Sequence, residues 1–459
     1  MIFRVSKLLL RALMLLVAVA LLVLGLFAWL LITGPVSVAW LTPHLERELS
    51  TERVSVDIAE TQLRLGEDRT LDLSAVGVQL RDTDGRLLSE VPAVEIGLST
   101  SAMLLKGRIA VRRIDARGPT LTLIRRADGS IGLHERPDQA DADEFDLRAV
   151  LVDLFAPTER GEARFLEHVR VSGGELILQD QGVGRSLHAR DAELSVAVIN
   201  DRVDAELAFR LDQPDGSAEV HLGTTHEAEQ EWVDLDLAFE NLTPAAFAEF
   251  LPDLPLAGIR LPVSGSAQSA ISTAGELDLI LFDLAAQAGV VDVPRLRLAE
   301  LPIDALWLQG TLAADLDAVV IDQLDLSTNG ARLRGRAEVD WRDGEPSLRA
   351  DLEAENVTID HVARFWPPHK GRRARAWVLE HVSAGVVPSA RAQLRFGPGE
   401  LEQKPLPDDA LAGEFTFEDL SVRYVDTMPP LVGVDGSATF TGQSMDFTVA
   451  SGHVGDLVV

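Results

Sequence analysis

Hydrophobic and polar residues alternate with a period of two over most of the chain beyond residue 50. Examples are Val54, Val56 and Ile58, then Leu207, Phe209 and Leu211, and later Leu324 and Leu326. Because side chains of a β-strand point alternately to its two faces, this period predicts strands with one apolar and one polar face. Helical spacing is almost absent between residues 170 and 360. We therefore expect a mainly β protein with a long curled antiparallel sheet, groove-like and taco-shaped, and a few short helices.

Turn signals support antiparallel neighbours. Six dipeptides combine Asn or Asp with Gly: Asp84–Gly85, Asp128–Gly129, Asp215–Gly216, Asn329–Gly330, Asp343–Gly344 and Asp435–Gly436. Tight hairpins need residues that accept positive φ, which these dipeptides supply. Helical spacing occurs at residues 147–155, after Thr243–Pro244, and at residues 373–381 behind Pro367–Pro368.

An apolar stretch precedes the strands. Residues 12–32 contain no charged side chain, and as a helix they would be roughly 32 Å long, enough to span a bilayer. Arg4, Lys7 and Arg11 come before this stretch, so the positive-inside rule predicts a cytoplasmic N-terminus. The alternative is a cleaved signal peptide, because Ser37–Ala39 loosely fits a small-x-small cleavage site. We expect an uncleaved transmembrane helix and a body outside the cytoplasm.

These patterns divide the chain into six regions. We expect a membrane anchor over residues 1–35, an N-terminal β region over 36–145, a helical insertion over 146–168, a repetitive β-groove over 169–358, a second helical insert with a Trp-Pro and a basic helix over 359–387, and further groove over 388–459.

Two stretches resemble a known family. Residues 94–133, VEIGLSTSAMLLKGRIAVRRIDARGPTLTLIRRADGSIGL, resemble the N-terminal signature of AsmA-like proteins, and residues 365–387, FWPPHKGRRARAWVLEHVSAGVV, are similar to a segment of their YhdP-type branch. The resemblance implies an inner-membrane protein with a chorein-like start and a long β-groove, a bridge-type protein that moves phospholipid toward the outer membrane. Members of that branch are usually much longer, so we expect this chain to be part of a longer protein.

The expected groove has two sets of candidate residues. The period-two leucines that would line it for acyl chains are Leu121, Leu123, Leu176, Leu178, Leu235, Leu237, Leu277, Leu279 and Leu281. The basic residues that would contact lipid headgroups are Lys106, Arg108, Arg112, Arg113, Arg117, Arg125 and Arg126. Taken singly, each leucine also fits an ordinary core, and the basic run also fits a solvated face balanced by nearby acids.

Two functions of an amphipathic sheet remain open. The first is a periplasmic conduit for phospholipid between the inner and outer membranes, with acyl chains and the inner membrane as partners. The second is a periplasmic assembly factor that binds outer-membrane proteins by adding strands at the sheet edge.

Composition argues against several other classes. The formal net charge of −30 argues against nucleic acid, because phosphate binding needs a basic face. The chain has no cysteine, and it lacks His-Glu-x-x-His, Gly-x-Ser-x-Gly and phosphate-loop motifs. Paired acids such as Asp234 and Asp236 fall on the polar face of a strand without calcium-loop spacing. We therefore expect no catalytic residues, no metal and no cofactor.

Overall fold

The computed structural model describes residues 34–50, 54–65, 71–82, 85, 87–98, 111–126, 131–132, 167–199, 202–227, 230–250, 256–272, 276–292, 300–341, 345–369, 371–403, 405–425, 427–455 and 457–458. The chain forms two compact units, unit 1 with residues 1–210 and 225–229, and unit 2 with residues 211–224 and 230–459. The division passes through β10 (Arg202–Gln213) and β11 (Gly216–Glu227). Both units consist mainly of β-strands with few short helices among the described residues, which confirms that the protein is mainly β.

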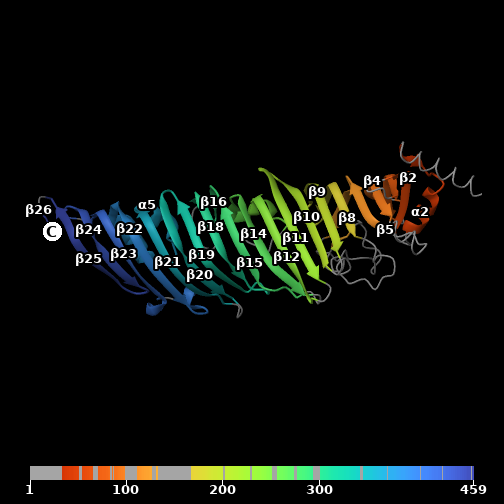
Figure 1. Cartoon of the computed structure of the whole chain (residues 1–459). Helices are drawn as coiled ribbons and strands as arrows, with labels where there is room; N and C mark the ends of the chain where they lie inside the picture. The colour runs from red at the N-terminus through yellow and green to blue at the C-terminus, as the bar shows by residue number, and fades with distance from the viewer. Residues whose placement is uncertain are drawn as a thin grey trace, which may run out of the picture. The chain divides into compact units, whose positions relative to one another are not determined.

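Among its described residues, unit 1 has the short helix α2 and a sheet (Figure 1). Its elements are β1 (Val36–Ser37), α2 (Thr42–Leu49), β2 (Val54–Leu65), β3 (Leu71–Asp82), β4 (Leu87–Leu98), β5 (Val111–Arg117), β6 (Thr120–Arg125), β7 (Ile131–Gly132), β8 (His168–Asp180) and β9 (Arg185–Ile199). Strands β1 to β5 pair antiparallel in chain order. The same arrangement holds for β6 with β7 and for β8 with β9.

The expectation of a purely antiparallel sheet is wrong in unit 1. Both β5 and β6 pair with β8 in parallel, and both pair with β4 antiparallel. Only Gly118 and Pro119 separate β5 from β6, so the two strands together follow β8 along its length. Parallel neighbours need a crossover of about a dozen residues or more, and the chain between Gly132 and Glu167 is long enough for one.

Helix α2 closes one side of unit 1. The carboxylate of Glu46 accepts the Ile58 N–H at 2.9 Å, and the hydroxyl of Ser50 accepts the Val56 N–H at 2.9 Å. These side chains satisfy donors at the edge of β2 that would otherwise be open to another strand. Leu45 packs on the core cluster of Val56, Ile58, Ala75, Val78 and Val91. Thus α2 protects the edge and covers part of the apolar face.

Unit 2 carries a longer run of antiparallel strands. They are β12 (Trp232–Leu242), β14 (Val263–Ser272), β15 (Ile280–Ala286), β18 (Ala305–Leu312), β19 (Ala318–Thr328), β20 (Ala331–Asp340), β21 (Ser347–Thr358), β22 (Val382–Phe396), β23 (Leu411–Val422), β24 (Leu431–Thr441), β25 (Met445–Val454) and β26 (Leu457–Val458). Each pairs with the next in this order. A separate small sheet contains β13 (Ile259–Arg260), β16 (Gly289–Val291) and β17 (Leu301–Ile303).

Short helices occupy the connections of unit 2. Those in the described residues are the 3₁₀ helices η2 (Pro244–Phe247), η3 (Leu256–Gly258), η5 (Glu400–Glu402) and η6 (Asp408–Ala410), and the α-helices α5 (Ile359–Phe365) and α6 (Arg372–His381). Helix α5 begins at a capping box in which the Thr358 N–H donates to His361 Nδ1 at 3.0 Å. The Arg375 guanidinium donates to the carbonyls of Trp366 and Ala363, which ties α6 to α5.

Two expected elements lie outside the described residues. They are the membrane anchor at residues 12–32 and the helix at residues 147–155. Within the part of the chain that the structure describes, no helix has the length and apolar character needed to cross a bilayer.

Candidate functional site

Three parallel rows of apolar residues cross the sheet of unit 2. Row A contains Leu237, Ala267, Phe282, Gly310, Ile321, Ala337, Ala350, Leu394 and Leu411. Row B contains Phe239, Gly265, Leu284, Leu308, Leu324, Gly335, Leu352, Ala392, Gly413, Phe440 and Met445. Row C contains Leu242, Val263, Ala286, Leu306, Leu326, Leu333, Ala354, Ala390, Phe415, Ala438 and Phe447. Consecutive members face each other on neighbouring strands, so one face of the sheet is apolar throughout.

The apolar rows are only partly shielded from solvent. Every leucine in them is half-buried, whereas the fully buried members include small residues such as Ala350 and Ala438. At β25 the exposed fraction rises to 40% for Met445 and 52% for Phe447. The large side chains facing the interior of a two-layer sandwich would be fully buried. Among the described residues, the rows are therefore not packed under a continuous second layer.

Glycines of the rows let large side chains lie against the sheet. A Cβ added at Gly310 would lie 2.0 Å from the Val320 carbonyl oxygen and 3.0 Å from Cζ of Phe282, the residue opposite. A Cβ at Gly413 would lie 2.3 Å from Cζ of Phe440. Every other residue carries a Cβ, so only glycine fits at these two positions without a shift of the neighbouring atoms. The aromatic rings thus occupy the space above the glycines, which keeps them close to the backbone.

The predicted lining leucines of unit 2 divide between the two faces. Leu235 and Leu237 lie on the apolar face of β12, and Leu277 bridges to Ile271 on the same face of β14. Leu281 pairs with Gln268, which places it on the opposite, polar face, where it is 48% exposed. The expectation that Leu277, Leu279 and Leu281 share one face of a strand is therefore wrong.

An irregularity before β15 causes this change. In the register of β15 with β14, residue 278 would face Ile271, but Leu277 occupies that place. The additional residue reverses the alternation, so that Phe282 and Leu284 continue the apolar rows. Leu279 precedes the strand and is 46% exposed.

The predicted lining leucines of unit 1 lie together. Leu121 pairs with Leu176, and Leu123 pairs with Leu178, in the parallel ladder of β6 and β8. Leu178 in turn faces Leu187 on β9. All four predicted leucines are half-buried.

The predicted basic residues are mostly ion-paired. Arg112 lies 3.7 Å from Glu167, and Arg125 lies 3.1 Å from Asp180. Arg126 is half-buried, whereas Lys106 and Arg108 lie outside the described residues. Arg113 and Arg117 alternate with Ile114 and Ala116 on β5, whose apolar cross-strand partners are Ile96 and Val94. These two arginines thus point to the face opposite the apolar residues of unit 1.

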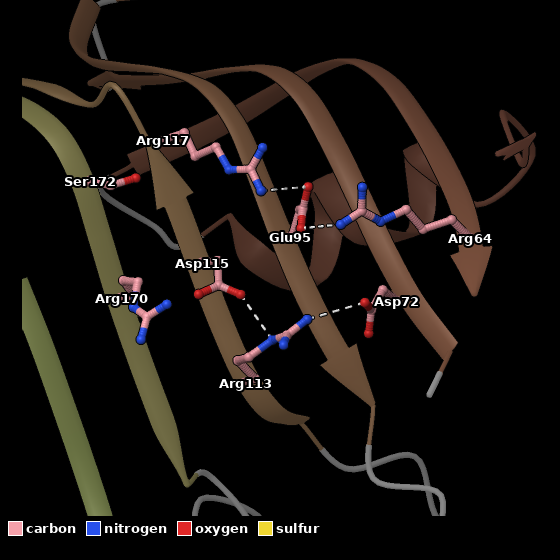
Figure 2. A pocket seen from close by; sticks show the side chains of 8 residues that line it. All are labelled: Arg64, Asp72, Glu95, Arg113, Asp115, Arg117, Arg170 and Ser172. Carbon is pink, nitrogen blue, oxygen red and sulfur yellow. Dashed lines mark hydrogen bonds and ion pairs between the residues drawn. The ribbon is translucent and has the colours of Figure 1, made fainter. Parts of the chain in front are cut away.

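Arg113 and Arg117 belong to a cluster that we call the arginine pocket (Figure 2). Its lining residues are Arg64, Asp72, Glu95, Arg113, Asp115, Arg117, Arg170 and Ser172, around a cavity of about 420 Å³. Arg113 contacts Asp72 at 3.1 Å and Asp115 at 2.9 Å. The Glu95 carboxylate forms ion pairs with the guanidinium groups of Arg64, at 2.5 Å, and Arg117, at 3.3 Å. The side chain of Asp72 is completely buried, and that of Glu95 is 8% exposed.

Sequence reasoning missed most of this pocket. Asp72 and Arg170 are almost one hundred residues apart and have no motif in common. The parallel pairing of β5 with β8, which places Asp115 opposite Arg170, brings them together. The one signal was the alternation of charged residues Arg113, Asp115 and Arg117 along β5.

The polar face of unit 2 is a ladder of ion pairs. Charges of alternating sign follow one another across β19 to β23: Asp325, Arg334, Glu353, Arg391 and Glu414. Arg391 lies 3.0 Å from Glu353 and 3.7 Å from Glu414. Beside this row, hydrogen bonds from Arg395 and Arg336 lower the pKa of Asp351. The pKa of Asp325 is likewise lowered, first by its hydrogen bond from Arg332.

Within the described ranges, no group of three or more acidic or histidine side chains is arranged to hold a metal ion. No protein-family model, no curated protein and no solved structure matches the chain.

Proposed function

We propose that this protein carries phospholipid between the inner and outer membranes of a bacterium, with acyl chains resting on the apolar face of its sheet. Residues 12–32 would anchor it in the inner membrane, and the body would lie in the periplasm. The curled, groove-like form of the sheet is part of this proposal, as is the relation to AsmA-like proteins. Transport in this scheme needs no catalytic residue.

One observation carries the proposal. Rows A, B and C continue without a polar interruption from β12 to β23, and rows B and C extend to β25. Their leucines remain half-buried. Because a monomeric protein seldom leaves so extended an apolar surface unused, the rows favour a role in binding an apolar ligand.

The energetics suit an acyl chain. Exposing one methylene group to water costs roughly 0.8 kcal/mol, so a lipid tail cannot leave a bilayer into water unaided. An apolar face that continues over many strands offers replacement contacts at each step. The polar headgroup can remain in water, since nothing in this scheme requires its burial.

The matched pair Leu326 and Ser327 tests the proposal. Leu326 belongs to row C, whereas Ser327 follows it on β19, faces Arg332 and points to the polar face. A photoreactive amino acid at position 326 of the full chain, activated in cells with radiolabelled phospholipid, is expected to become labelled. The same amino acid at position 327 is expected to remain unlabelled.

Function should follow the labelling. In Leu326→Asp the carboxylate would interrupt the row and abolish the support of outer-membrane integrity, whereas Ser327→Asp should behave like the natural protein. Equal labelling at both positions, or protein adducts in place of lipid at position 326, would overturn the proposal. The second outcome would favour the binding of client proteins.

A further inference from the structure

The arginine pocket contains one more positive than negative side chain. Four arginines and three carboxylates line it. Glu95 receives two arginines, and Arg113 lies between Asp72 and Asp115. Every carboxylate of the pocket therefore already has a cationic partner. The surplus charge belongs to Arg170.

Arg170 has no partner among the described residues. It makes no ion pair or side-chain hydrogen bond, whereas every other arginine on a described strand makes an interaction. Asp115 is its neighbour in the ladder, but the Asp115 carboxylate lies 2.9 Å from Arg113 instead. Arg170 is exposed, so its guanidinium group is accessible from solvent, beside carboxylates that other arginines already neutralise.

The donors of the pocket come from two adjacent strands. Arg170 and Ser172 are two residues apart on β8, so both point to the same face. Arg117 is the partner of Ser172 in the parallel ladder, and its side chain is 59% exposed. Two guanidinium groups and one hydroxyl thus belong to the lining of one cavity (Figure 2). Its volume of about 420 Å³ falls within the range of small-molecule sites.

We propose that the arginine pocket binds a phosphate group, as a free anion or as a phosphoester, through Arg170, Arg117 and Ser172. Guanidinium groups bind phosphate oxygens by paired hydrogen bonds, and a hydroxyl adds a further donor. The four tetrahedral oxygens of phosphate can receive donors from both β5 and β8, whereas a carboxylate offers only two in one plane. The pocket lies on the face opposite the apolar residues of unit 1, so this proposal is independent of the proposed function.

Calorimetric titration of the full chain in neutral detergent tests the proposal. The probes are inorganic phosphate and glycerophosphoglycerol, a deacylated phosphodiester headgroup, each compared with potassium chloride at equal ionic strength. We expect saturable binding of at least one probe. Binding of phosphate alone would assign the site to free phosphate or monoesters, and binding of the diester would assign it to lipid headgroups.

Two variants show whether binding occurs at the pocket. Arg170→Ala should weaken binding about tenfold, the loss expected for one charge-assisted hydrogen bond, without lowering the unfolding temperature. Arg349→Ala removes the same charge from the exposed pair with Glu338 in unit 2 and should leave binding unchanged. Equal weakening by both variants would show a general charge effect and overturn the site. If Arg170→Ala does not fold, the titration of the natural chain is the test. The proposal is overturned if neither phosphate nor glycerophosphoglycerol binds that chain saturably.

Discussion

The apolar faces of the two units have the same alternating pattern but different surroundings. In unit 1, Val56 and Ile58 are 7% and 6% exposed, and Leu45 of α2 packs against their cluster. In unit 2, Leu308, Leu324 and Leu352 lie on the apolar face of their strands and are only half-buried. Hence alternation specifies an apolar face, but not what covers that face.

The two units also bury their apolar side chains differently. The cluster below α2 contains four β-branched residues and Ala75, and Leu45 of the helix packs against it. In unit 2, large side chains such as Phe282 and Phe440 lie over glycines of the neighbouring strand. In a sheet such as that of unit 2, the neighbouring backbone contacts one side of each large side chain and leaves its other side available to a ligand. This difference predicts which substitutions each unit tolerates.

The largest expected effect comes from placing a charge under α2. Ile58→Asp would bury an unpaired carboxylate and remove a core side chain, which should cost at least about 4 kcal/mol in the free energy of unfolding. Leu326→Asp leaves its carboxylate at a half-buried site with access to water and should cost at most about 2 kcal/mol. Hydrogen exchange measured by mass spectrometry should show loss of protection across β2–β4 for the first variant, and little change in β19 and β20 for the second.

Equal loss of hydrogen-exchange protection in Ile58→Asp and Leu326→Asp would contradict the difference between the two apolar faces. In that case the apolar face of unit 2 would be as tightly covered as that of unit 1. Ser327→Asp serves as the control for a new charge on the same strand, because Ser327 faces Arg332 on the polar side.

A glycine of row A gives the next largest effect. In Gly310→Ala the new Cβ would meet the Val320 carbonyl at 2.0 Å, so the strands must separate and Phe282 must move. Overpacking of this kind costs typically about 1–3 kcal/mol. Gly223→Ala is the matched control, because a Cβ there would meet Asp236 at an ordinary 3.7 Å. Urea unfolding should show a lower midpoint for Gly310→Ala and an almost unchanged one for Gly223→Ala; equal midpoints would show that the rings are not held against glycine.

The strands were predictable because alternation depends on one strand and not on its partners. The hairpin signal at Asn329–Gly330 also succeeds, since both residues have positive φ between β19 and β20. The signal at Asp435–Gly436 fails, because both residues lie inside β24 at an irregular register and Gly436 lies close to the Phe417 ring. A glycine needed for close approach has the same sequence signature as one needed for a turn.

Features that depend on distant partners were not predictable. The arginine pocket requires β5 and β8 to be parallel neighbours, and no local pattern encodes that pairing. The face of Leu281 depends on a single additional residue before β15. Such an insertion reverses every later side chain of the strand, although the apolar spacing still looks regular.

The polar faces of the two units differ in how deeply their carboxylates are buried, and the pH dependence of Asp351 gives the smallest of the three expected effects. The carboxylate of Asp72 is completely buried in unit 1, whereas Asp351 of unit 2 lies at a side-chain exposure of 28% between Arg395 and Arg336. Those two arginines lower the pKa of Asp351 below its ordinary value of 3.8 in the folded chain. A depressed carboxyl pKa stabilises the fold above the unfolded value, and this contribution disappears as the pH falls through the folded value.

Asp351→Asn should therefore reduce the stability of unit 2 slightly at pH 6, and the difference from the natural chain should vanish below the folded pKa. Urea unfolding at a series of pH values between 6 and 2 measures this convergence. Asp446→Asn, at an exposed position of β25, controls for the loss of one negative charge. A difference for Asp351→Asn that persists unchanged into acid would mean that Arg336 and Arg395 do not stabilise the ionised carboxylate, and that the ladder of ion pairs contributes no pH-dependent stability at this position.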